Sequence, residues 1–224
     1  MLDLPVPAPG PPGPFGTMAW LRATVSRFAN GEPHARRRGL IEARLAALDP
    51  HALATAATRA AATPATIAAA PPAAATPPAT GASPPPAAGS ALAGVPREYL
   101  PVAVLAHATG VIDPVAAVTH TRAVAAAYHP GTDASGADDA LDALLALFPP
   151  DEPEALAQHV AILVQACEAT AGLIRGDNLP VKTTKRVTPD GEIVLVDLSG
   201  RPFGEGPRRC PGEAHARAFA EALR

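Results

Sequence analysis

The segment that most constrains the fold is residues 51–95, which consist largely of Ala, Thr and Pro. Prolines recur throughout its second half, for example in the runs that begin at Pro71 and Pro84. Proline removes a backbone donor and clashes with the preceding turn, so repeated prolines interrupt a helix. Almost no side chain in this stretch is large enough to anchor a core. We therefore expect a disordered linker at 51–95, with folded segments on either side.

The composition limits what those folded segments can bury. Of the 224 residues, 48% are hydrophobic, but much of that share is alanine; aromatic residues make up 4%, and 28 residues are proline. The hydrophobic core is therefore expected to be modest. The net charge of −3 gives no general attraction to nucleic acid or to acidic membranes, and we expect neither as a partner.

The cysteine content and the N-terminal residues indicate in which cellular compartment the protein is expected. The two cysteines, Cys167 and Cys210, do not make a disulfide framework. Residues 1–14 are rich in proline and lack the basic start and apolar core of a secretory signal. No run approaches the roughly 18 apolar residues of a membrane helix. We expect a soluble, cytoplasmic protein.

These patterns divide the chain into four segments. Residues 1–16 are predicted to be a proline-rich tail, extended and mobile. Residues 17–50 are predicted to be a helical segment, and the linker 51–95 follows it. Residues 96–224 are predicted to be a second, larger helical portion. The expected fold class is mainly α.

Apolar residues recur at helical spacing in several stretches, and Gly or Pro marks their ends. Within residues 176–201, two β-prone runs flank a turn at Pro189-Asp190-Gly191, which predicts a β-hairpin. The predicted helices cover residues 18–28, 33–45, 99–109, 115–128, 138–148, 151–174 and 213–223.

A tight loop at residues 202–212 places a cysteine between two arginines and a predicted helix. Backbone N–H groups and the positive end of that helix converge there, which favours the thiolate of Cys210, the form that binds metals. Gly206 and Gly212 allow turns that a β-carbon would block. Arg208 can meet a carboxylate with a two-pronged hydrogen bond.

The spacing of this loop, Phe203-x-x-Gly206-x-Arg208-x-Cys210-x-Gly212, resembles the haem-binding loop of the cytochromes P-450, the haem-thiolate monooxygenases. The resemblance implies that Cys210 is the axial ligand of the iron of haem b. It also implies that Arg208 holds a haem propionate and that Phe203 packs near the sulfur. The alternative is an ordinary Gly/Pro turn with an incidental cysteine, which the match at all five fixed positions disfavours.

Two further stretches resemble propionate-binding parts of the same family. His34 and Arg38 are four residues apart and project from one helix face, as in the family's C-helix. Because Arg36 and Arg37 lie between them, a basic solvated helix face stays open as the alternative. Arg186, in the predicted hairpin, matches a family strand that supplies another propionate contact. The alternative there is a basic edge strand kept soluble by its charges.

Within the predicted helix 151–174, Glu168 and Thr170 resemble the oxygen-activating acid and threonine of the family's I-helix. In the family the acid directly precedes the threonine, whereas here the two are separated by one residue. This offset turns their side chains about 200° apart on an ideal helix. Either Glu168 faces elsewhere or the helix is distorted. A structural role for Thr170, bonding back to its own helix, also stays open.

Parts of the family pattern are absent. The family places a Glu-x-x-Arg helix between its oxygen-activating helix and its cysteine loop, and the interval here is too short to contain one. Its N-terminal β-rich region and much of its substrate-roofing helices are also missing. The resemblance covers scattered parts of 17–50 and 96–224. It implies a reduced cytochrome P-450-like helical fold that retains the haem cradle.

The function implied by the resemblance is that of a haem-thiolate monooxygenase, which oxidises a small organic substrate with O2. Electrons would come from a ferredoxin-type partner, because the chain has no flavin or nicotinamide motif. The missing Glu-x-x-Arg and the displaced acid favour an alternative, a non-catalytic haem-binding or partner-binding remnant of the family. A third hypothesis is a shortened product that does not fold stably.

Overall fold

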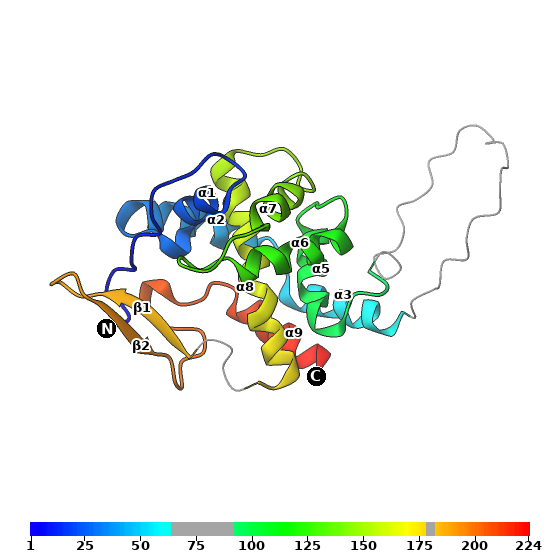
Figure 1. Cartoon of the computed structure of the whole chain (residues 1–224). Coiled ribbons are helices and arrows are strands. Elements are labelled where there is room, and N and C mark those ends of the chain that lie inside the picture. The colour runs from blue at the N-terminus through cyan, green and yellow to red at the C-terminus, as the bar shows by residue number, and fades with distance from the viewer. Residues whose placement is uncertain (64–91, 178–181) are drawn as a thin grey trace.

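The computed structural model describes residues 1–63, 92–177 and 182–224. Within them the chain forms eight α-helices and a two-stranded antiparallel sheet, which confirms the prediction of a mainly α protein with a small β-hairpin (Figure 1). The elements are α1 (Met18–Thr24), η1 (Ser26–Phe28), α2 (Gly31–Ala46), α3 (Pro50–Ala62), η2 (Arg97–Tyr99), α5 (Leu100–Ala108), α6 (Pro114–Ala126), α7 (Ala137–Leu145), α8 (Pro153–Arg175), β1 (Thr183–Val187), β2 (Ile193–Asp197), η3 (Gly206–Arg208) and α9 (Glu213–Leu223).

Helix α8 is the central element of the core. Most of its length is buried, and it packs against α2, α5, α6 and α9 (Figure 1). Its end is set by Gly176, whose left-handed conformation (φ 78°) directs its N–H back to the carbonyls of the last turn. The predicted helix 151–174 is confirmed, with its start two residues later and its end one residue later.

The same helix meets the length and composition criteria of a membrane span, with a mean hydropathy of 1.2, although we expected no segment to approach them. Of the 18-residue window of α8 that meets these criteria, 67% is buried inside the protein. A buried core helix meets the same criteria, so this observation is weak evidence for a membrane segment.

The predicted start of the linker at residue 51 is wrong, because residues Pro50–Ala62 form α3. Asp49 caps this helix by accepting from the backbone N–H groups of its first turn, and Pro50 suits the first position. One side of α3 is buried against α5 and α9 (Figure 1). Alanine favours helix strongly and its small side chain permits close packing, so this contact does not need large side chains. The buried residues of α3 are Leu53, Ala54, Ala57 and Ala60.

The other end of the predicted linker also has to be corrected. Leu92 is 2% exposed and belongs to the main hydrophobic core, which also contains Tyr99 and Leu100. The chain is therefore packed into the core from residue 92, before the predicted boundary at residue 96. Residues 64–91, the rest of the predicted linker, lie outside the described residues.

The predicted mobile tail at residues 1–16 has to be corrected for its first residues. Leu2 and Val6 are only 7% and 9% exposed, and Leu2 packs with Val196 and Leu198 beside the hairpin. Residues 2–6, which we name the N-terminal strap, therefore lie against the C-terminal part of the chain.

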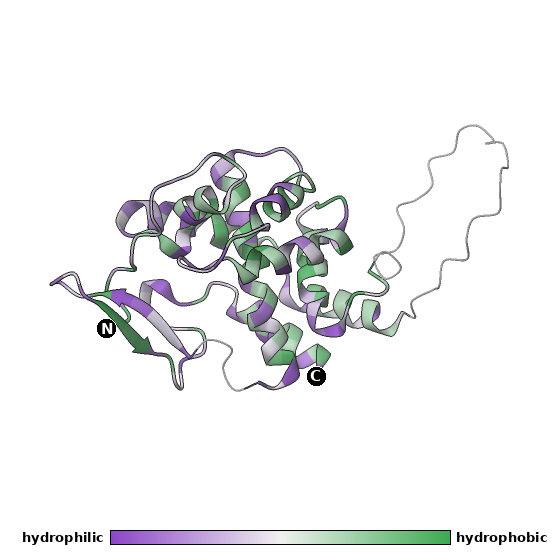
Figure 2. Cartoon of the chain, viewed as in Figure 1, coloured by the Kyte–Doolittle hydropathy of each residue, from purple (hydrophilic) through white to green (hydrophobic). Residues whose placement is uncertain are grey.

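The hairpin has the predicted position. Thr183 pairs with Asp197 and Val187 with Ile193, so the turn falls between residues 187 and 193. Figure 2 shows β2 as a continuous hydrophobic ribbon beside a mixed β1. Leu195 is 66% exposed and Ile193 62%, so the hydrophobic character of β2 extends to its outer face.

Candidate functional site

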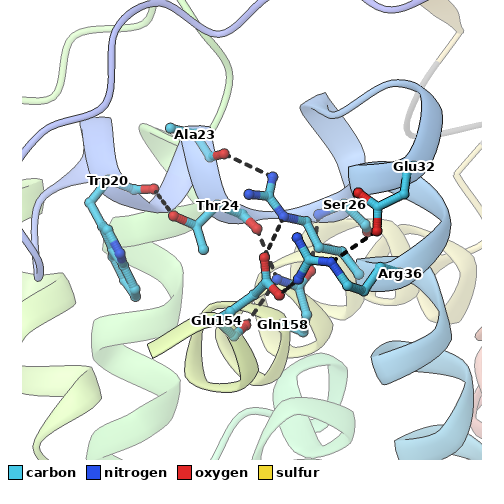
Figure 3. A network of polar contacts seen from close by, with 9 residues as sticks. Trp20, Ala23, Thr24, Ser26, Glu32, Arg36, Glu154 and Gln158 are labelled. Carbon is cyan, nitrogen blue, oxygen red and sulfur yellow. Dashed lines mark hydrogen bonds and ion pairs between the residues drawn. The ribbon is translucent and has the colours of Figure 1, made fainter. Parts of the chain in front are cut away.

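Two basic side chains of α2 join it to α8. Arg36 and Arg37 both pair with the carboxylate of Glu154 in the first turn of α8, and the Nε of Arg37 lies 2.8 Å from that carboxylate (Figure 3). Arg37 also donates from Nη1 to the carbonyl of Ala23, at 2.9 Å. Arg37 therefore serves packing between helices, whereas Arg36 is half exposed and remains part of a solvated face.

Gln158 continues this network one turn along α8. It is 1% exposed; its Oε1 accepts from the N–H of Ser26 (2.9 Å), and its Nε2 donates to the carbonyl of Thr24 (2.9 Å) (Figure 3). The network thus fixes α1, η1 and the first half of α2 relative to α8. That arrangement sets the direction of the remaining side chains of α2.

His34 and Arg38, the predicted pair on α2, lie close to Arg208 of the cysteine loop (residues 202–212). Burial lowers the pKa of His34, and the charges of Arg208 and Arg38 lower it further. Arg38 forms an ion pair with Glu42 one turn on, with Nε 2.7 Å from Oε1. His34 therefore lies within the electrostatic reach of both Arg38 and Arg208.

Arg208 makes its hydrogen bonds to uncharged groups. Its Nη2 donates to the carbonyl of Ala29 (2.8 Å) and to Oδ1 of Asn30 (2.7 Å). Burial lowers the pKa of the Arg208 guanidinium, and the charges of Arg186, Arg27 and Arg38 act in the same direction. Arg208 is thus surrounded by other cations.

Arg186 reaches the same place from β1. It is only 6% exposed, so it does not keep an edge strand soluble. Its guanidinium donates to the carbonyls of Leu2 (3.1 Å) and Lys185 (2.8 Å) and to the hydroxyl of Thr184 (2.7 Å). Burial lowers its pKa, and the charge of Arg27 lowers it further.

We name these five residues, Arg27, His34, Arg38, Arg186 and Arg208, the cation cluster. Among the described residues, Arg27, Arg186 and Arg208 form no ion pair with a carboxylate. Guanidinium groups that have no carboxylate partner attract carboxylates or phosphates and bind them with charge-assisted hydrogen bonds. The cluster therefore has the chemistry of an anion site.

The cysteine loop closes on itself beside this cluster. The N–H of Cys210 donates to the carbonyl of Phe203 at 2.8 Å. Gly206 has φ +62°, a left-handed conformation that favours glycine, and a β-carbon there would lie 2.7 Å from Oδ1 of the exposed Asp3 side chain, which can move aside. Gly212 has φ −93°, which any residue adopts, so the predicted special need for glycine at that position is wrong.

Cys210 is free and exposed. The N–H of Gly212 and the charges of Arg38 and Arg27 favour its thiolate, as predicted, but desolvation by the surrounding protein atoms has the larger effect. The pKa of Cys210 is therefore raised above its ordinary value. Desolvation therefore opposes the local groups that favour the thiolate, and a bound metal ion would stabilise the thiolate against it.

The ring of Phe203 lies under the guanidinium of Arg217, with 4.8 Å between Cζ and the ring centre. Both residues line an open depression of about 280 Å³, together with Arg209 and Glu213. A second open depression, of about 400 Å³, lies between the end of α3 and residues 94–100. Cys210 and Thr170 line neither.

The predicted acid and threonine of α8 do not come together. The helix is regular throughout, so Glu168 and Thr170 project about 200° apart. Glu168 is exposed and accepts a hydrogen bond from the hydroxyl of Tyr99 at 3.0 Å. Thr170 is 3% exposed and lies in the core. Of the two alternatives for Glu168, the structure therefore supports the one in which it faces elsewhere.

The sequence prediction missed three residues of this region. Arg27 lies in η1, and its charge acts on Arg186, Arg208 and Cys210. Asp3 and Asn30 also contact the loop or its arginines. No spacing pattern could have identified them, because each is brought to the site by the packing of distant segments.

Haem b carries two carboxylates and an iron that needs an axial ligand. Arg27, Arg186 and Arg208 of the cation cluster offer guanidinium groups that form no ion pair among the described residues, and Cys210 offers a free thiol. The chemistry of these residues fits both ends of the group. Within the described parts of the chain, no group of three or more His, Cys, Asp or Glu is placed to hold a metal ion.

Comparison of the chain with protein-family models, curated proteins and solved structures found no match.

Proposed function

We propose that this chain binds haem b through Cys210 and acts as a haem-thiolate monooxygenase related to the cytochromes P-450. It would oxidise a small organic substrate with O2, using electrons from a ferredoxin-type donor. The observation that supports this proposal is convergence: the charges of Arg38 on α2 and Arg186 on β1 both act on Arg208 of the cysteine loop, and the charge of Arg38 also acts on Cys210.

In this proposal each residue has a separate task. Arg208, Arg186 and Arg38 bind the two carboxylates, and they orient the porphyrin. His34, whose lowered pKa keeps it neutral near pH 7, donates a hydrogen bond without adding charge. The sulfur of Cys210 ligates the iron. Haem held by a thiolate supplies the redox chemistry for O2 activation.

Specific observations favour a second candidate, a haem-binding protein without oxygen chemistry. Proton delivery to a reacting oxygen needs a hydroxyl or acid within hydrogen-bond reach. Glu168 is instead bonded to Tyr99 at the surface, and Thr170 is buried two positions further along a regular helix. The pair that performs this task in the family is therefore not assembled on α8.

Reconstitution with haem tests the shared part of both candidates. We expect the reduced protein to show a thiolate-type Soret band under carbon monoxide. Cys210→Ala should abolish that band, whereas Cys167→Ala, the matched control at the other cysteine, should retain it. An unchanged spectrum in Cys210→Ala would overturn the assignment of the ligand.

Thr170→Ala separates the two candidates. In a monooxygenase that uses this hydroxyl, the variant binds haem normally but releases peroxide instead of product. In a haem-binding protein without oxygen chemistry, wild type and variant consume reductant alike. In that case neither forms product from a broad panel of small organic substrates.

A further inference from the structure

The N-terminal strap contacts two arginines of the cation cluster. The carbonyl of Leu2 accepts from Nε of Arg186 at 3.1 Å. Val6 exchanges two hydrogen bonds with Asn30, each 2.9 Å long, and Oδ1 of Asn30 also accepts from Arg208. The strap therefore occupies donors of Arg186 directly and donors of Arg208 through Asn30.

The strap is also held to the hairpin, independently of the arginines. The N–H of Val187, next to Arg186 on β1, donates to the carbonyl of Pro5 at 2.8 Å. Leu2 and Val6 are buried at either end of the segment. Between them Asp3 is exposed, with its carboxylate against Gly206 of the cysteine loop.

Asp3 places a negative charge at the edge of the cluster. Its Oδ1 lies only 2.7 Å from the position that a β-carbon of Gly206 would take, and its charge acts on Arg186. Asp3 forms no ion pair with a described cation, so it lowers the positive potential of the site without saturating any guanidinium.

We propose that the N-terminal strap is an internal competitor of the ligand: Asp3 repels an incoming anion, Leu2 occupies a donor of Arg186, and Val6 holds Asn30, which occupies a donor of Arg208. The identity of the ligand as a dicarboxylate porphyrin rests on the proposed function. To bind, its carboxylates must replace these neutral acceptors and overcome the charge of Asp3. The strap thereby weakens the binding of anions at this site, and the repulsion by Asp3 grows with the charge of the anion.

The test is Asp3→Asn, which removes the charge and keeps the shape of an exposed side chain. We expect haem to bind on the order of fivefold more tightly, as removal of one nearby repulsive charge in a solvated setting predicts. The gain should shrink as salt is raised. Asp190→Asn, in the exposed turn of the hairpin, changes the net charge equally and should leave the affinity unchanged. Haem dimethyl ester, which lacks the two charges, should bind Asp3→Asn and wild type equally.

Hydrogen exchange gives a second readout. The amides of Val6 and Val187 are bonded to Asn30 and Pro5, so displacement of the strap by bound haem should speed their exchange.

The outcomes separate this proposal from the proposed function. If wild type and Asp3→Asn bind haem equally, the strap does not compete, although the haem site stands. If the wild type binds no haem, the proposed function fails. Titration with inorganic pyrophosphate then tests whether the strap competes with anions. Tighter pyrophosphate binding by Asp3→Asn than by wild type and Asp190→Asn supports competition. Equal or undetectable binding in all three overturns it.

Discussion

Replacing Gln158 by leucine tests whether the polar network beneath α2 stabilises the fold. The substitution keeps the volume of the side chain but removes its amide, so the N–H of Ser26 and the carbonyl of Thr24 both lose their partner. Each buried group left unpaired costs about 1–3 kcal/mol, and leucine recovers part of this as a hydrophobic side chain. We expect a net loss of about 2–4 kcal/mol in the free energy of unfolding.

Urea unfolding followed by circular dichroism measures this loss. With a urea dependence of about 2 kcal/mol per molar, the midpoint should fall by roughly 1–2 M at an unchanged slope. Gln165→Leu is the matched control on the same helix, because Gln165 is exposed and its side chain bonds only to its own helix, at the carbonyl of Ala161. That variant should stay within about 0.5 kcal/mol of the wild type.

Equal midpoints for the two glutamine variants would refute the reasoning. Such a result would mean that water or a shifted η1 satisfies Ser26 and Thr24 at little cost. The network would then not fix the direction of His34 and Arg38.

Two further predictions concern titratable groups. Cys210 should be alkylated in the folded protein, and because desolvation raises its pKa, the rate should increase as pH rises through the alkaline range. Burial raises the pKa of Cys167 to about 12, so this cysteine should react only after unfolding. Mass spectrometry of the alkylated peptides checks this, and equal labelling of both cysteines would contradict it. Burial, with help from nearby arginines, lowers the pKa of His34, His129 and His159 in the folded state, so the unfolded state binds more protons below about pH 6.5. The urea midpoint should therefore be lower at pH 5.5 than at pH 7.5, and His159→Gln should reduce that difference; a midpoint that rises on acidification would show that the sign is wrong.

Local patterns predicted the elements whose signals are local. Helix α8 follows from its apolar spacing and from the glycine at its end, and the hairpin follows from the turn at Pro189-Asp190-Gly191. Helix α3 was missed because its packing surface is mostly alanine. Only the facing helices show that so small a side chain is buried.

For the candidate site as well, local sequence patterns identified some residues, whereas other features depend on tertiary packing. His34, Arg38, Arg208 and Cys210 could be selected from spacing, because each pair belongs to one short segment. The raised pKa of Cys210 could not be predicted, since local N–H groups and helix polarity favour the thiolate and only tertiary packing supplies the opposing desolvation. The position of the strap was equally hidden, because proline content says nothing about which surface an extended segment contacts.

The contacts of the cation cluster also determine when the site can form during synthesis of the chain. Arg186 bonds to a residue 184 positions earlier, and Arg208 to one 179 positions earlier. Helices α1 and α2 can form while the ribosome is still adding later residues, but the cluster stays incomplete until the hairpin and cysteine loop have emerged. The early segments must therefore keep their arginines available for much of translation. Loading of any ligand at this site is consequently a late step, and a ribosome that stalls before residue 208 leaves a chain unable to bind it.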